Sequence, residues 1–124
     1  MKREKHVILV VGSDGDAKYA ICQRIEKDQH IILSCAADLL TETIEKLVYD
    51  HGRLDGIIFM AEVGDEKEFL ELSFEDWRRV MDQNLDMAIL CCQCAAEQMI
   101  HQGKREHPYS ILLIVNTIDV FENS

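Results

Sequence analysis

The sequence predicts an α/β fold of three layers, in which helices flank a sheet of about four parallel strands. Short apolar runs alternate with segments of helical periodicity along the chain, a pattern typical of β–α–β units. The first run, Val7–Val11, has no polar alternation and is expected to be a strand buried on both faces. A chain of 124 residues is long enough for one such domain and short for two.

Four apolar runs are expected to form the strands. In chain order they cover Val7–Val11, His30–Cys35, Asp55–Ala61 and Ser110–Val115. A helix of about twelve residues is predicted from Asp16, because apolar residues recur there with helical spacing. A second helix begins near Thr41 or Glu42 and ends at Gly52, a residue type that commonly ends helices.

The longest predicted helix runs from Glu75 to about Gln102. Ser73 and Asp76 have the spacing of a capping box at its start. Helical periodicity predicts a buried stripe along it. That stripe consists of Trp77, Val80, Met81, Leu85, Ala88, Cys92, Ala95 and Met99.

The charge balance excludes two classes of partner. Lysine and arginine number 13, aspartate and glutamate 23, and the net charge is −10. Nucleic acid and anionic membrane surfaces are bound by basic patches, so we expect neither as a partner. The N-terminal segment lacks the apolar stretch of a signal peptide, and no apolar run reaches the ~18 residues that span a bilayer. We therefore expect a cytoplasmic protein.

The cysteines fit a reducing compartment. They are odd in number and lie in apolar surroundings, at Cys22, Cys35, Cys91, Cys92 and Cys94. Such residues are typical of reduced thiols that serve as small core side chains. A metal site is not predicted, because on a helix only the first and last of the three clustered cysteines share a face, and further ligands at suitable spacing are missing.

Several segments, taken in order, resemble the short-chain dehydrogenase/reductase family. They are the glycine-aspartate motif in His51–Ile58, Ala37-Asp38, the helix start Glu75–Leu85 and the strand start Ser110–Leu112. The resemblance covers nearly all of the chain. It implies a Rossmann-like fold, NAD or NADP as cofactor, and a long helix used in dimerisation.

The turn after the first strand departs from the family pattern of Thr-Gly-x-x-x-Gly-x-Gly. Gly12 holds the first glycine position, but Asp16 and Lys18 hold the other two. A carboxylate at a helix N-terminus suits the helix dipole and repels a pyrophosphate. Two interpretations stay open: Asp16 is an ordinary helix cap, or phosphate binding has shifted to Gly15 and Lys18.

Two further departures concern the cofactor. A strand-and-helix unit of the family, which carries the residue that selects NAD or NADP, is missing after the first helix. The family's Asn-Asn-Ala-Gly sequence is replaced by Phe59-Met60-Ala61-Glu62. No cofactor is therefore expected, with NAD or NADP as the alternative.

The family's catalytic residues are also incomplete. Its mechanism needs a tyrosine whose pKa is lowered by a lysine four residues later. In this chain Gln23, Arg53 and Leu113 follow Tyr19, Tyr49 and Tyr109 at that spacing. Only Asn84 matches a catalytic residue of the family, and it can equally be a helix-interior residue that bonds the backbone. No catalytic set is predicted.

These observations predict that residues 1–124 form a single truncated domain of the Rossmann-like type, without catalytic competence. We expect it to act as a binding or assembly module. The alternative is a subunit or fragment of an NAD(P)-dependent oxidoreductase of the same family, completed by another chain.

Any small ligand is expected at the carboxyl ends of the strands. By analogy with the family, its contacts are Gly12, Ser13, Asp14, Gly15, Ala61, Glu62, Val63, Asn116 and Thr117. The alternative is that the crevice holds no ligand and is partly filled by Phe59, Met60 and the acidic loop.

The expected assembly is a homodimer, and a different protein partner is possible. The predicted last strand, residues 111–115, lies at a sheet edge, and exposed edges favour association. The long helix, residues 75–102, carries apolar residues outside its buried stripe. The dimer is expected through this helix, through the strand, or through both.

Overall fold

A computed structural model describes residues 5–12, 15–61 and 69–115. Four strands form one parallel sheet in the order β2-β1-β3-β4. They are β1 (Val7–Val11), β2 (Ile31–Cys35), β3 (Gly56–Ala61) and β4 (Ser110–Val115). All four lie within one residue of the predicted runs, which confirms the α/β class and the parallel sheet.

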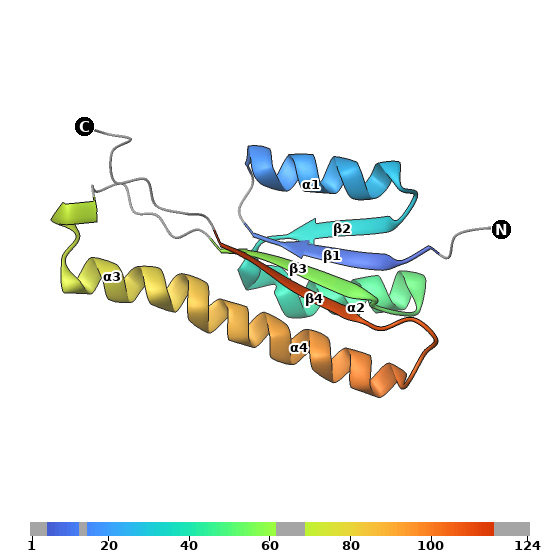
Figure 1. Cartoon of the computed structure of the whole chain (residues 1–124). Coiled ribbons are helices and arrows are strands. Elements are labelled where there is room, and N and C mark those ends of the chain that lie inside the picture. Colours follow the sequence, from blue (N-terminus) through green and yellow to red (C-terminus); the bar gives the residue numbers. More distant parts are fainter. Residues whose placement is uncertain (1–4, 13–14, 62–68, 116–124) are drawn as a thin grey trace.

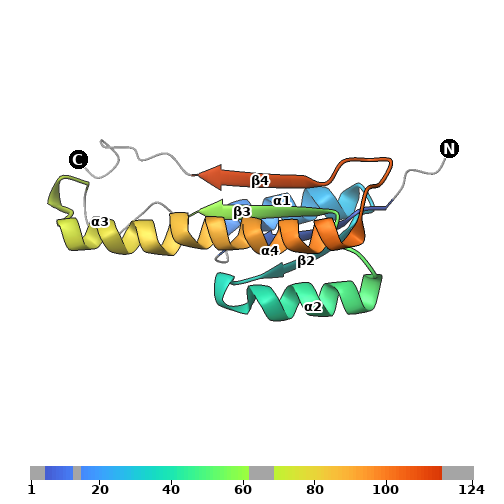
Figure 2. The ribbon, with the colours of Figure 1, turned by 90° about the horizontal axis from the view of Figure 1, so that it is seen from below.

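Helices cover the two faces of this sheet. Helix α1 (Asp16–Lys27) lies on one face, and α2 (Leu40–His51) and α4 (Met87–Gln102) lie on the other (Figures 1 and 2). A shorter helix, α3 (Phe74–Met81), continues into α4 and extends beyond the carboxyl ends of the strands (Figure 1). The three predicted layers are confirmed.

The core lies between the sheet and the helices α2 and α4. Alternate residues of β1 and β3 face it, because side chains of a strand point to opposite faces in turn. Its most deeply buried members include Val7, Leu9, Val11, Leu47, Leu54, Ile57 and Cys91. Val10 is fully buried although it points to the opposite face, as predicted for a central strand.

Two predicted helix ends have the expected geometry. Ser73 accepts a hydrogen bond from the Asp76 amide, and the Asp76 side chain accepts one from the Ser73 amide, which completes the capping box. Gly52 ends α2 in the left-handed conformation, with φ of 80°. A glycine adopts this conformation without the steric penalty that a Cβ causes.

The long helix differs from the prediction in its middle. Residues Asp82–Asp86 form a π-helical turn between α3 and α4. This wider turn changes the buried stripe: Asn84 and Cys91 are buried, whereas Leu85 is 50% exposed and Cys92 is half-buried. The predicted stripe assumed 3.6 residues per turn throughout, so it was wrong at Leu85 and Cys92. It was also wrong at Trp77, which lies before this turn and is 39% exposed. It was right at Val80, Ala88, Ala95 and Met99.

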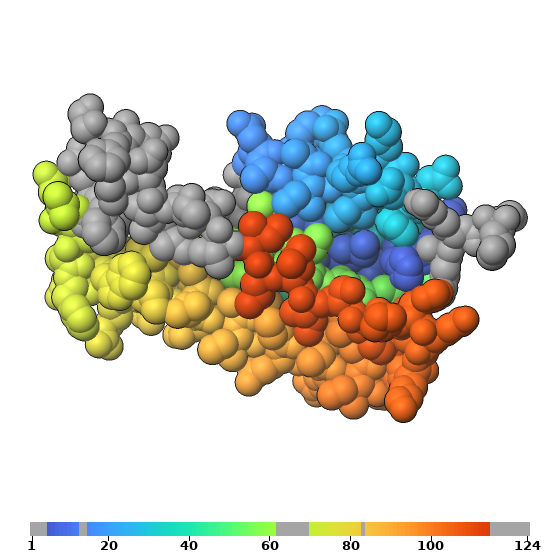
Figure 3. Space-filling view, in the orientation of Figure 1, coloured from blue at the N-terminus to red at the C-terminus, as the bar shows by residue number. Residues whose placement is uncertain are grey.

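Strand β4 lies at the edge of the described sheet. It pairs with β3 from Ser110 to Val115, and Figure 3 shows it at the surface above α4. Ile111, Leu112 and Leu113 are each between 42% and 50% exposed. The strand therefore presents partly uncovered apolar side chains on both of its faces.

Candidate functional site

The carboxyl ends of β1 and β3 meet at Gly12, directly after β1. The Gly12 amide donates a hydrogen bond to the carbonyl of Cys35 at 3.1 Å, which joins the end of β1 to the end of β2. Gly12 has a φ of +153°, and a Cβ added to it would lie 3.1 Å from the Cβ and the carbonyl oxygen of Met60. Any other residue would therefore be strained and would press against β3.

The N-terminus of α1 opens toward the same edge. Its N-cap residue is Gly15, which has no side chain to bond the first-turn amides, and space is open around its Cα. The first amides of a helix have no partner within the helix and carry the positive end of its dipole. Backbone donors at this position are a suitable cradle for a phosphate group.

Lys18 lies beneath this turn. Its side chain is directed inward, so that the residue is only 5% exposed. The ammonium nitrogen Nζ donates to the carbonyl of Gly12 at 2.7 Å and reaches the carbonyl of Cys35 at 3.5 Å. A single cationic group thus contacts the ends of β1 and β2.

The thiol of Cys35 responds to this environment. Burial raises the pKa of Cys35, while a hydrogen bond with Thr43 and the charge of Lys18 act in the opposite direction. Burial raises the pKa of Cys22 as well, again against the charge of Lys18. Burial is the largest cause of the raised pKa at both thiols, and the negative charges of Asp38, at Cys35, and Glu26, at Cys22, act in the same direction as burial.

The end of β3 contributes an apolar surface. Phe59 and Ala61 are buried and Met60 is half-buried. The aromatic ring of Phe59 belongs to the core. Most of the acidic loop that the alternative interpretation invoked lies outside the described residues. Of the predicted contacts, Gly12, Gly15 and Ala61 do lie at this edge. The others, Ser13, Asp14, Glu62, Val63, Asn116 and Thr117, lie outside the described residues.

Asn84 occupies the π-helical turn. It is 8% exposed, and its Nδ2 donates to the carbonyl of Val80 at 2.8 Å. The side chain thus satisfies a carbonyl where the wider turn disturbs the usual ladder of helical hydrogen bonds. This is the backbone-bonding role that the sequence left open for it.

Two features of this region could not be read directly from the sequence. The inward direction of Lys18 is one, and the role of the Cys35 carbonyl is the other. A signal for the first existed: Lys18 falls on the helix face that also carries Ile21, Cys22 and Ile25, so helical spacing directs it toward the sheet.

Neither a metal site nor a membrane-spanning helix is found among the described residues. No three histidine, cysteine, aspartate or glutamate side chains in these segments are placed to hold a metal ion. No helix in the same part of the chain is both long enough and apolar enough to cross a membrane.

A family model for short chain dehydrogenases matches residues 1–107. The chain belongs to the short-chain dehydrogenase family. An Escherichia coli relative named as an uncharacterised oxidoreductase, YohF, is 38% identical over 61 residues, which is 49% of this chain and 24% of that protein. A Mycobacterium tuberculosis relative, the uncharacterised oxidoreductase Rv1714, is 29% identical over 80 residues, 62% of this chain and 30% of that protein.

Solved structures show the same fold. The aldohexose dehydrogenase of Thermoplasma acidophilum, in ligand-free form, superposes with a TM-score of 0.68 at 19% identity, over 88% of this chain and 48% of that one. A short-chain type dehydrogenase/reductase from Mycobacterium marinum has a TM-score of 0.62 at 17% identity, over 87% and 54% of the two chains. This short-chain dehydrogenase chain thus spans about half the length of these structures and less of the curated relatives.

Membership of the family corrects one prediction. The expectation of no cofactor was wrong, because short-chain dehydrogenases are NAD(P)-dependent proteins. It gave too much weight to the glycines replaced by Asp16 and Lys18. The groups that hold a phosphate at a helix N-terminus are main-chain amides. Helix α1 has such amides in its first turn, which starts at Asp16, and Gly15 is its uncrowded cap.

The order of the strands in the sheet shows how the chain accommodates the loss of the strand-and-helix unit that follows the first helix in the family. In doubly wound folds of this type the third strand is separated from the first by the second. Here β2, whose following residues Ala37-Asp38 resemble the end of the family's third strand, pairs directly with β1 from Val7↔Ile31 to Val11↔Cys35. The shortened connection therefore closes the sheet without a gap.

Proposed function

We propose that this chain is a nucleotide-binding module of NAD(P)-linked oxidoreductase chemistry that does not complete carbonyl reduction by itself. The single observation that carries the proposal is the N-terminus of α1, which opens beside Gly12 and is capped by Gly15, in a family that uses NAD or NADP. The first-turn amides of α1 would hold the pyrophosphate, and Gly12 keeps β1 and β3 close below it. When bound, the nicotinamide cofactor supplies or accepts a hydride.

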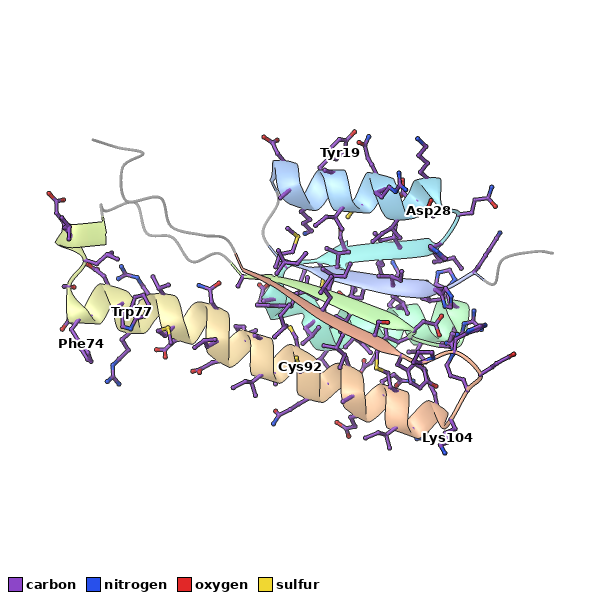
Figure 4. All side chains as sticks on the ribbon, in the orientation of Figure 1. Tyr19, Asp28, Phe74, Trp77, Cys92 and Lys104 are labelled. Carbon is purple, nitrogen blue, oxygen red and sulfur yellow. The ribbon has the colours of Figure 1, made fainter. Side chains whose placement is uncertain are left out.

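The tyrosines support the absence of independent catalysis. Tyr19 lies on the outer side of α1, away from the sheet (Figure 4), and is 65% exposed. Tyr49 is 90% exposed on α2. The hydroxyl of Tyr109 donates to the carbonyl of Gly103 at 2.7 Å, next to the amino end of β4. None of the three has a lysine four residues later, and none is placed at the carboxyl edge where the cofactor is expected.

The five free thiols support the expectation of a reducing, cytoplasmic compartment, since disulfides are rare there.

Titration with NADH and NADPH, followed by calorimetry and thermal melting, tests the binding. A ligand that binds only the folded state stabilises it, by about 2.7 kcal/mol at a hundredfold excess over Kd. We expect stabilisation by at least one of the two nucleotides. Failure of both to bind at millimolar concentration would overturn the proposal.

A pair of variants at Gly15 locates the site. Gly15 has an extended φ of 173° and open space around it, so side chains are tolerated. Asn and Asp both cap helices well, but only Asp adds a negative charge. We expect Gly15→Asp to weaken nucleotide binding more than Gly15→Asn, while both keep the melting temperature. Equal affinities would place the pyrophosphate elsewhere.

A separate assay tests the proposal that the chain does not complete carbonyl reduction by itself. The chain is mixed with NADPH and a panel of aldehydes and ketones, and the absorbance of the reduced nicotinamide is followed. We expect binding without consumption of NADPH. Turnover that survives repeated purification and is lost in Gly15→Asp would show that the chain is an enzyme alone.

A further inference from the structure

We propose that Lys18 is an electrostatic anchor for the phosphate groups of the nucleotide, acting from beneath the start of α1. This inference rests on the proposed function and adds a residue to it. It assigns to one buried side chain a role that the family pattern gives to backbone alone.

Burial of Lys18 sets it apart from the other lysines. Among the lysines in the described segments it alone is buried, at 5% exposure, whereas Lys5, Lys27, Lys46 and Lys104 are exposed. Removing an ammonium group from water is costly, and lysine is rarely buried unless its charge is paired. The carbonyls of Gly12 and Cys35 pair Lys18 within the chain, and they also fix its charge at the edge of the sheet where a phosphate is expected.

Geometry directs the charge to the carboxyl edge. Nζ lies 2.7 Å from the carbonyl oxygen of Gly12 and 3.5 Å from that of Cys35, the residues at the ends of β1 and β2. Helix α1 starts at Asp16, two residues before Lys18, and the carbonyl of Gly12 that accepts from Nζ lies three residues before the N-cap Gly15. Helix dipole and ammonium add at this point, because both present positive charge.

Asp16 carries a negative charge near the positive charge of Lys18. The two residues differ in burial, and this difference affects how strongly each charge acts. Asp16 is exposed in the first turn of α1, where water and salt screen its carboxylate. Lys18 is buried, where the effective dielectric constant is lower and a charge acts more strongly. The buried charge of Lys18 therefore offsets part of the repulsion expected from Asp16, and Asp38 adds a second negative charge near the end of β2.

The experiment compares three variants with a series of ligands that differ in phosphate content. Lys18→Met removes the charge and keeps the length of the side chain, and Lys18→Arg keeps the charge. Lys27→Met is the matched control: it changes net charge equally, but Lys27 is exposed nine residues further along α1, a rise of about 14 Å. Adenosine, ADP, NADH and NADPH are titrated by calorimetry at low and at high salt.

We expect Lys18→Met to weaken ADP and NADH binding about tenfold, which corresponds to roughly 1.4 kcal/mol of lost electrostatic attraction. Adenosine affinity should stay unchanged, and the salt dependence of ADP binding should become shallower than in the unmodified chain. Lys18→Arg should recover part of the affinity, and Lys27→Met should behave as the unmodified chain.

Each remaining outcome has one meaning. If the unmodified chain binds none of the ligands, the proposed function itself fails. If it binds and Lys18→Met equals Lys27→Met, the role of Lys18 is overturned while the function stands. If the affinities for adenosine and for ADP fall equally in Lys18→Met, Lys18 is structural and the inference is overturned. The inference is also overturned if the melting curve of Lys18→Met shows an unfolded chain and Lys18→Arg does not restore the salt dependence of ADP binding.

Discussion

The guanidinium group of Arg105 contacts the carboxylate of Asp55, and this ion pair holds the loop after α4 to the start of β3. Asp55 is 4% exposed. Its Oδ2 accepts a hydrogen bond from the Val7 amide at 2.7 Å and pairs with Nε of Arg53 at 3.0 Å. One carboxylate therefore joins β1, β3 and the approach to β4 at the amino edge of the sheet, opposite the candidate site.

Replacing Asp55 by Asn should destabilise the fold by about 3 kcal/mol, because the guanidinium group of Arg105, which is 16% exposed, loses its carboxylate partner. Denaturant unfolding measures the free-energy change. Asp50→Asn on the exposed side of α2 is the control and should alter the free energy of unfolding by less than about 0.5 kcal/mol. Equal effects of the two variants would show that the ion pair is not a stabilising element.

Gly12→Ala should cost about 1–3 kcal/mol of folding free energy, because of its positive φ and the 3.1 Å approach of Met60. Gly15→Ser is the matched control. Its Cβ would meet nothing within 4 Å, and serine is at least as good an N-cap residue as glycine. Thermal melting of the two variants decides the point, and a neutral Gly12→Ala would contradict the close packing described here.

Cys91 should make the stability fall at alkaline pH. Burial, with smaller contributions from Cys35, Cys92 and Cys94, raises the pKa of the Cys91 thiol from 9.0 to about 12. The folded state therefore favours the protonated thiol, while the unfolded chain ionises near pH 9. The resulting stability is complete below that pH and is lost as the pH rises toward 12, with a slope of at most about 1.4 kcal/mol per pH unit from this group.

Unfolding free energies at about pH 8 and about pH 10 measure this slope. Cys91→Ala should reduce the loss between the two pH values, although the smaller side chain costs about 1 kcal/mol at either pH. Cys92→Ala, at a half-buried position on the same helix, is the comparison. An unchanged pH dependence in Cys91→Ala would contradict the assignment.

We propose a homodimer that uses the outer side of α4, the edge strand β4, or both. On α4, Ile89 is 58% exposed, Leu90 44% and Ile100 80%. Leu90→Glu and Ile89→Glu should produce monomers in light scattering without loss of monomer stability. A monomer of 14.3 kDa in the unmodified chain at high micromolar concentration would reject the dimer. Dimers that survive both substitutions would point to β4.

Cys94 is a poor test position for the helix route. It is half-buried and packs against the core cluster, so Cys94→Glu would disturb the fold as well as an interface. Substitutions that test dimerisation through α4 are therefore better made at exposed residues such as Ile89.

Strands and caps could be read from the sequence because the signals are local. An unbroken apolar run bounded by polar residues predicts a strand of a parallel sheet, and the runs Val7–Val11 and Ser110–Val115 have the predicted bounds. The capping box at Ser73 and the glycine at the end of α2 depend on residues within one helical turn. The position of the candidate site follows from this order, because parallel strands bring their carboxyl ends together.

Only the tertiary structure decided the direction of individual side chains across elements. Lys18 was known as a departure from a glycine motif, but contacts with carbonyls of two strands place its charge beneath the start of α1. Asp55 and Arg105 are fifty residues apart, and nothing local pairs them. The π-helical turn moved Leu85 to the surface and Cys91 into the core. These features depend on how the elements pack against one another, whereas a sequence pattern describes one element at a time. Packing also determines how deeply each charged group is buried, and burial determines how strongly its charge acts.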